Sequence, residues 1–184
     1  MATTAPSLLP EKVPVPSSPT SREYRATVGL FTTGVAVMTA HAVGLEHGMT
    51  LNSFTSVSLD PLLVLVCVER DALMHKVLEE TGSFAISVLG GDQEPIARYF
   101  ADSSRPPGAA QFDGLGYRTG AATNAPLLDD ALAWLECEVE RAYDGGDHSV
   151  FLARVMTVER GRVREPLLYF GGTYRRLNDG RPAA

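Results

Sequence analysis

Residues 48–61 read Gly-Met-Thr-Leu-Asn-Ser-Phe-Thr-Ser-Val-Ser-Leu-Asp-Pro, and residues 62–68 continue as Leu-Leu-Val-Leu-Val-Cys-Val. The first segment is crowded with hydroxyl and amide side chains and is rich in Thr and Val, which predicts a strand over 48–59. The second segment is apolar at every position. We therefore expect it to be a central strand, buried on both faces, that closes a barrel or lies under a helix.

Helices and further strands are predicted on both sides of this pair. A helix capped by Thr20 or Ser21 should run to about Gly34 and lie against a sheet, because Tyr24, Val28 and Phe31 form one apolar stripe. Asp71 is a suitable cap for a helix that ends at Gly82. The remaining predicted elements are strands over 34–42, 83–89, 132–143, 149–159 and 167–174 and a helix over 93–100.

These elements amount to six or seven strands and two or three helices in one domain, which predicts a mostly β fold with flanking helices. The strands do not alternate with helices as a doubly wound fold requires. We place the domain at residues 21–177, between a disordered, Pro-rich tail (1–20) and a flexible C-terminus (178–184). The loop over 101–112 is expected to cover a ligand or to form a subunit contact.

Composition limits the classes of partner and the location. The 184-residue chain has a formal net charge of -6, which argues against binding to nucleic acid. No apolar run approaches the length of a transmembrane helix, and the N-terminus lacks a signal-peptide pattern, so we expect a cytoplasmic protein without membrane contact. For Cys67 and Cys137, buried reduced thiols are favoured over a disulfide.

Several common site motifs are missing. Gly114, Gly116 and Gly120 are spaced one residue too widely for a dinucleotide fingerprint, and no helix pattern follows them. The four histidines have no ligand partner at a metal-binding interval, and no G-x-S-x-G nucleophile elbow occurs. These observations argue against Rossmann, metal and hydrolytic chemistry. Taken alone, residues 48–61 are more typical of a Ser- and Thr-rich strand with one face in solvent than of a binding segment.

Several segments together, however, resemble the flavin reductase-like family, the short-chain reductase component of two-component flavin-dependent monooxygenases. The resemblance implies an FMN-binding split β-barrel, a homodimer, and reduction of FAD or FMN by NADH or NADPH. The reduced flavin would then pass to a separate monooxygenase. The segments that carry it are 31–35, 48–61, 62–68, 82–89, 145–148 (Gly-Gly-Asp-His) and 166–170.

The same resemblance assigns residues to the flavin. The matching strand lies along the flavin in the family, so that role falls here to Gly48, Met49, Thr50, Asn52 and Ser53. Other residues complete the flavin pocket by resemblance: Cys67, Val68, Glu69, Met74, Tyr99 and Phe100. The sequence departs from common members over 72–75, where small hydroxyl residues often touch the flavin phosphates. Arg70 is a candidate to compensate, and a solvated charge at a strand end is the competing interpretation.

On the nicotinamide side the resemblance places His148, the candidate catalytic residue, together with Tyr169, Phe170, Gly171 and Gly172. A surface histidine bonded to Asp147 is an equal alternative for His148. Tyr174 would pack against either ring system or belong to the core. Because hydride passes between the two cofactors, the protein has to align their rings rather than supply a nucleophile.

No Lys or Arg occurs from residue 41 to residue 69, so the flavin phosphates should be held only modestly, as suits a flavin that leaves as product. Two alternatives remain open. One is a split-barrel enzyme that retains its flavin and reduces another acceptor. The other is a non-enzymatic protein that binds flavin or haem.

Overall fold

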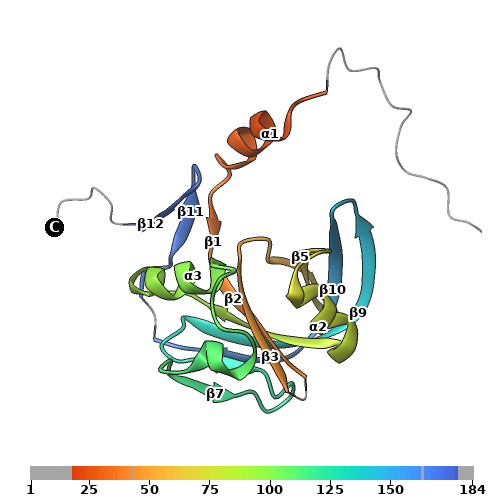
Figure 1. Ribbon diagram of the computed structural model, residues 1–184, viewed down its shortest axis with the longest axis vertical. Coiled ribbons are helices and arrows are strands. Elements are labelled where there is room, and N and C mark those ends of the chain that lie inside the picture. The colour runs from red at the N-terminus through yellow and green to blue at the C-terminus, as the bar shows by residue number, and fades with distance from the viewer. Residues whose placement is uncertain (1–17, 43, 163, 178–184) are drawn as a thin grey trace, which may run out of the picture.

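The computed structural model describes residues 18–42, 44–162 and 164–177. The predicted disordered tail (1–20) lies outside these residues except for residues 18–20, and the predicted flexible C-terminus (178–184) lies wholly outside them. The described chain is mostly β, as predicted, with helices beside the sheets (Figure 1). Seven antiparallel strands form the main sheet in the order β3-β2-β6-β9-β10-β5-β4. Their bounds are β2 Ala36–Ala42, β3 Leu45–Leu51, β4 Thr55–Leu59, β5 Leu62–Glu69, β6 Ser83–Val88, β9 Ala133–Gly145 and β10 His148–Arg160.

The main sheet curls into a barrel because its two edge strands follow one another in the chain. β3 ends at Leu51 and β4 begins at Thr55. A chain this short reaches at most about 14 Å, so one end of β3 must lie near one end of β4 although they are opposite edges of the sheet. The segment over 48–59, expected as one strand, is therefore two strands with a corner between them.

The barrel interior holds the main core. Residues from β2, β5, β6, β9 and β10 meet there, and α2 (Leu73–Thr81) packs onto them with Met74, Val77 and Leu78. β5 was expected to be buried on both faces, but the burial of its side chains alternates along the strand. Val64, Val66 and Val68 are buried, whereas the residues between them are only half-buried, since β5 lies next to the edge strand β4.

Smaller elements surround the barrel. α3 (Glu94–Ala101), which follows a 3₁₀ turn (Gly91–Gln93), packs beside β3 together with a second 3₁₀ turn (Gly108–Phe112) within the expected loop. A three-stranded sheet has the order β1-β11-β12, and a two-stranded sheet pairs β7 with β8. Their bounds are β1 Thr33–Gly34, β11 Leu168–Phe170, β12 Thr173–Arg175, β7 Tyr117–Thr119 and β8 Pro126–Leu128. The strand expected over 167–174 is thus a hairpin.

The first helix differs most from expectation. α1 (Ser21–Val28) ends six residues before Gly34 and has no buried residue, so it does not pack on the sheet as predicted. Figure 1 shows it standing clear of the barrel. Its start is stabilised locally by a capping box, in which the Thr20 hydroxyl accepts from the Glu23 N–H (3.3 Å) and the Glu23 carboxylate accepts from the Thr20 N–H (2.8 Å). The apolar stripe is present, but the described part of the chain leaves its residues exposed.

α2 also begins differently from the prediction. Its N-cap is Ala72, which makes no side-chain capping hydrogen bond, and not Asp71. Its end agrees with the prediction, because Gly82 follows the last turn in the left-handed conformation (φ 61°). None of the helices that the structure describes has both the length and the apolar composition needed to cross a bilayer.

Candidate active site

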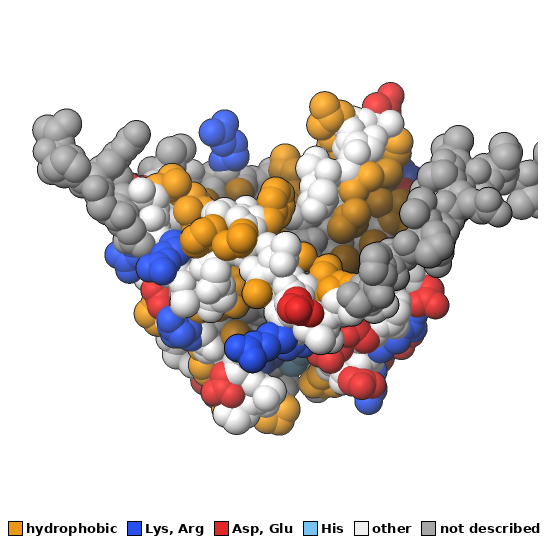
Figure 2. Space-filling view, turned by 90° about the horizontal axis from the view of Figure 1, so that it is seen from above, with side chains coloured by type: hydrophobic (Ala, Val, Ile, Leu, Met, Phe, Trp, Pro, Cys, Tyr) orange, Lys and Arg blue, Asp and Glu red, His pale blue; other side chains and the backbone are white. Residues whose placement is uncertain are grey.

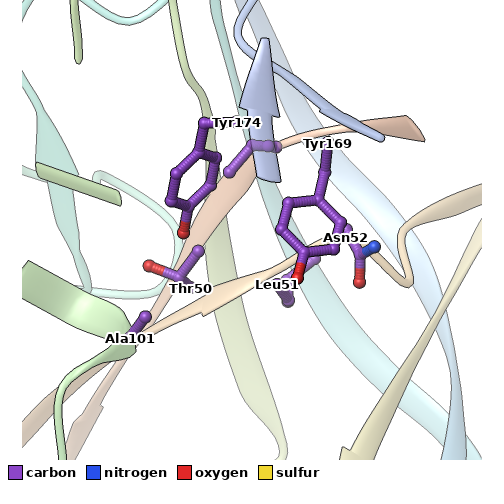
Figure 3. Close-up of a pocket in the computed structure, with 7 residues that line it drawn as sticks. Thr50, Leu51, Asn52, Ala101, Tyr169 and Tyr174 are labelled. Carbon is purple, nitrogen blue, oxygen red and sulfur yellow. The ribbon is translucent and has the colours of Figure 1, made fainter. Parts of the chain in front are cut away.

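The polar strand β3 borders three adjoining cavities, all of which Thr50 helps to line. The first, of about 200 Å³, lies between β3 and the β11–β12 hairpin. Figure 3 shows that Thr50 and Asn52 lie on one side of it, and that the rings of Tyr169 and Tyr174 reach in from the hairpin. The two rings meet edge to face, and their centroids are 5.6 Å apart. This cavity therefore combines an aromatic wall with a polar one.

The second cavity, of about 240 Å³, brings three strands together. β3 and the residues just after it contribute Met49, Asn52 and Ser53, the end of β5 contributes Cys67 and Glu69, and β10 contributes His148. The sheet register explains this meeting, because His148 pairs with Glu69 across β10 and β5. Seven of the residues that the sequence suggested for the site line this one cavity: Met49, Thr50, Asn52, Ser53, Cys67, Glu69 and His148.

The hydroxyl groups along β3 are largely used within the protein. Ser53 Oγ donates to the Cys67 carbonyl (3.0 Å) and accepts from the Cys67 N–H (3.1 Å). Thr50 Oγ1 donates to the Ala97 carbonyl on α3 (2.7 Å), and the Asn52 amide donates to Thr33 Oγ1 (3.2 Å). These bonds join β3 and its corner to β5, α3 and β1, so they fix the wall of the cavities.

His148 stands at the tip of the long β9–β10 hairpin. A two-residue turn, Gly146-Asp147, places it at the first position of β10. Its Nδ1 lies 2.8 Å from the Asp147 carboxylate, and 43% of its side chain is exposed. The hydrogen bond to His148, together with its charge, lowers the pKa of Asp147. The imidazole is thus oriented by a neighbouring carboxylate and faces a cavity.

The third cavity, of about 540 Å³, lies between β3 and the loop after α3. It is lined by Met49, Thr50, Glu69 and Phe100, and by Arg105 from the loop. Arg105 is the one Lys or Arg that lines any of these three cavities among the residues that the structure describes. Within the same residues, no three His, Cys, Asp or Glu side chains gather where they could hold a metal ion.

Comparisons with known proteins identify the family of this chain. Residues 28–178 match the family model described as the flavin reductase like domain. The chain belongs to the flavin reductase-like family. An NADH-dependent FAD reductase of Streptomyces globisporus is 49% identical over 166 residues, which are 88% of this chain and 90% of that protein.

Solved structures extend the likeness to the fold. The flavin reductase component BorF of a bacterial two-component tryptophan halogenase has a TM-score of 0.82 at 51% identity, covering 86% of this chain and 98% of that one. The NADH:FAD oxidoreductase SgcE6 of Streptomyces globisporus, in complex with NAD and FAD fragments, has a TM-score of 0.80 at 46% identity, covering 87% and 94%. The split-barrel fold expected from the sequence is thereby confirmed.

In this flavin reductase-like chain, other suggested residues lie outside the three cavities. Val68 and Met74 are fully buried in the main core. Gly48 is buried against the ring of Phe100, and the Tyr99 hydroxyl donates to the Gln111 carbonyl (2.9 Å).

The β11–β12 turn holds Phe170, Gly171 and Gly172. Phe170 is 39% exposed, and the two glycines have positive φ. The Arg70 guanidinium donates to Asp144 and to the Gly146 carbonyl and lines none of the three cavities.

Sequence reasoning missed one polar cluster beside β3, made of His47, Arg105 and Gln111. Gln111 is fully buried, and Arg105 and His47 lie against it. Burial, together with the charge of Arg105, lowers the pKa of His47 to about 4. Burial also lowers the pKa of Arg105. Residues 105 and 111 come from a loop about 60 positions from β3, so no local pattern in the sequence signals their contact with it.

Proposed function

We propose that this protein is a reductase that uses NADH to reduce FAD or FMN and supplies the reduced flavin to a separate flavin-dependent monooxygenase. The observation that carries the proposal is the convergence of residues from β3, β5 and β10 on one cavity, beside the aromatic cavity under the β11–β12 hairpin. Its relatives carry names such as NADH-dependent FAD reductase, and HsaB of Rhodococcus jostii is named as a monooxygenase reductase subunit. The family and the site therefore support the same activity.

The proposed division of the site follows its walls. The β3 side, with Met49, Thr50 and Asn52, would hold the flavin, and His148 with Tyr169 would form the nicotinamide side. The two cofactors supply the hydride chemistry when bound. The protein's part is to align the two rings, to exclude water with its apolar strands, and to orient the carboxamide or stabilise negative charge through His148. Asp147 would hold that imidazole in place.

The charge of the cavities fits a flavin that leaves after reduction. Among the described residues the three cavities carry one Lys or Arg side chain, Arg105, and two carboxylates, Glu69 and Asp71. Flavin phosphates are bound most tightly by sets of Arg forks. With one such group and two nearby negative charges, we expect modest binding. That favours a freely exchanging flavin over the alternative of a retained one.

We also propose that the protein is a homodimer in which α1 and the residues after it contact a second copy. α1 buries nothing within its own chain, yet large apolar side chains are exposed there: Tyr24 (61%), Val28 (46%), Leu30 (64%) and Phe31 (77%). Figure 2 shows hydrophobic side chains beside a hollow on the face seen from above. Exposed apolar surface of this kind is typical of an interface. Light scattering should give a mass of about twice 19.7 kDa.

Within the cell, we place the enzyme in the cytoplasm, where reduced nicotinamide is available. Cys67 and Cys137 are both free, which is compatible with a reducing compartment.

The deciding experiment is the loss of absorbance at 340 nm from NADH with FAD, FMN or no added flavin. A free-flavin reductase shows a rate that saturates with added flavin and is close to zero without it. A rate that needs another acceptor and no added flavin would instead indicate an enzyme that retains its flavin. No oxidation of either NADH or NADPH would refute the proposed activity and favour a binding protein.

A further inference from the structure

We propose that Gln111 and Arg105 are positioning residues that complete the open edge of β3 and thereby hold the flavin strand in its working position. The inference rests on the proposed function, in which β3 forms the flavin side of the site. β3 is an edge of the seven-stranded sheet, with β2 on one side and no strand of the main sheet on the other. An edge strand leaves backbone N–H and C=O groups without partners from its own sheet.

Gln111 takes the place of a neighbouring strand at this edge. Its Oε1 accepts from the Gly48 N–H (2.8 Å), and its Nε2 donates to the Glu46 carbonyl (2.9 Å). Residues 46 and 48 are two apart, so these groups lie on the same side of the strand. One side-chain amide therefore forms the two hydrogen bonds that another strand would form. Nε2 also donates to the Gly108 carbonyl (2.8 Å), which ties the 3₁₀ turn to the strand.

Arg105 closes the same edge from the loop after α3. Its Nη2 donates to the Gly48 carbonyl and lies 3.3 Å from His47 Nε2. Its Nε faces Gln111 Oε1 at 3.3 Å, and its Nη1 donates to the Asp102 carbonyl. Both backbone groups of Gly48 are thus held, the N–H by Gln111 and the carbonyl by Arg105. No ion pair joins Arg105 to a carboxylate in the described part of the chain, and its Nε and Nη2 donors are directed at this edge.

The position of this clamp makes it relevant to the reaction. Gly48 precedes Met49 and Thr50, which line the second and third cavities. Gly48 is itself wedged against Phe100, since a Cβ there would lie 2.5 Å from that ring. A displacement of about 1 Å in a positioning element can reduce a rate about 100-fold. Releasing the edge at Gly48 should shift Met49 and Thr50 and so weaken flavin binding, although Gln111 itself lines none of the three cavities.

The chain offers a matched control. Gln93 is also a buried glutamine that bridges two backbone groups, accepting from the Gly90 N–H (2.9 Å) and donating to the Asp129 carbonyl (3.0 Å). It makes no contact with β3 in these hydrogen bonds. We compare Gln111→Leu and Gln93→Leu by thermal unfolding, by hydrogen exchange over residues 45–51, and by the Kd for FAD measured from flavin fluorescence.

Both variants should be destabilised, but only Gln111→Leu should speed exchange in β3 and raise the Kd for FAD, by about tenfold. Equal FAD affinity in the two variants, whether changed or unchanged, would overturn the inference. If Gln111→Leu does not fold, Gln111→Glu serves the same comparison against Gln93→Glu, because it keeps the acceptor for Gly48 and loses both Nε2 donations.

A third variant separates this inference from the proposed function. Thr50→Val changes a residue that lines the cavities and leaves the edge clamp in place. If Thr50→Val raises the Kd for FAD and Gln111→Leu does not, only the positioning role is wrong. If neither variant changes FAD affinity while NADH oxidation persists, β3 is not the flavin strand and the proposed site is wrong.

Discussion

At the scale of single residues, Ser53 shows how a predicted ligand can have a structural role. Both hydrogen bonds of its hydroxyl go to the backbone of Cys67, which joins the corner after β3 to β5. We expect Ser53→Ala to lower the free energy of unfolding by about 1–3 kcal/mol, since two backbone groups lose their partner. Urea unfolding measures this loss.

Ser56→Ala is the matched control for Ser53→Ala. Ser56 is an exposed residue of the neighbouring strand β4, so its hydroxyl is accessible to water. Its replacement should change the free energy of unfolding by less than about 0.5 kcal/mol. Equal losses in the two variants would show that the Ser53 hydroxyl does not bridge the strands.

His47 gives the protein an acid-sensitive point. Its pKa is lowered from 6.5 to about 4 in the folded state, mainly by burial and also by Arg105. Below pH 6.5 the unfolded chain therefore binds the proton more readily, and the free energy of unfolding should fall as pH drops from 6.5 towards 4. Three other titratable groups are placed near His47. The carboxylates of Glu69 and Asp71 line the third cavity together with it, and Glu46 precedes it in the chain.

The test is a comparison of wild type with His47→Gln, which cannot titrate. Unfolding free energies are measured by urea at intervals between pH 7 and pH 4. The wild type should lose stability more steeply than the variant over this interval, because all other titrating groups are shared. Parallel curves for the two proteins would contradict the assignment to His47.

At the scale of elements, α2 lacks a side-chain cap at its start. Its N-cap residue is Ala72, and the preceding Asp71 does not cap it. Serine at the N-cap position satisfies an unpaired backbone N–H. We expect Ala72→Ser to raise the free energy of unfolding by about 1 kcal/mol, measured by urea unfolding.

Asp71→Ala is a second test of which residue is the N-cap of α2. If Ala72 is the N-cap, removing the Asp71 carboxylate should change stability by less than about 0.5 kcal/mol. A loss of about 1 kcal/mol from Asp71→Ala, with no gain from Ala72→Ser, would place the cap at residue 71.

At the scale of the whole molecule, the exposed apolar side chains of α1 and the residues after it fit the proposed contact with a second copy of the chain. Phe31 is 77% exposed within one chain. A charge there would be buried against an apolar surface in the proposed dimer, which is costly. We expect Phe31→Asp to shift the mass measured by light scattering from dimer towards monomer, with the circular dichroism of the barrel retained.

The control for this variant lies at the opposite end of the molecule. Tyr117 is 44% exposed and belongs to β7, a strand that lies far from α1 in Figure 1. Tyr117→Asp should leave the mass unchanged. A dimer that survives Phe31→Asp, or one that Tyr117→Asp also dissociates, would rule out the α1 segment as the main contact.

The sequence by itself determined the fold class and much of the site. The Thr- and Val-rich runs, the stop of α2 at Gly82 and the Gly-Asp-His turn are local signals, because they depend on residues adjacent in the chain. The resemblance to the flavin reductase-like family likewise rests on segments that keep their order and spacing. Met49, Thr50, Asn52, Ser53, Cys67, Glu69 and His148 could therefore be named from sequence and do line one cavity.

Only the tertiary structure decided which surfaces are covered. α1 carries an apolar stripe that predicts burial, yet none of its residues is buried in the described part of the chain. β5 is apolar from Leu62 to Val68, yet its place beside the sheet edge leaves one face half-buried. The contact of Gln111 with Gly48 spans 63 positions, and long-range contacts of this kind depend on how the barrel closes. Burial and pairing between distant segments are properties of the packed chain, so no local pattern specifies them.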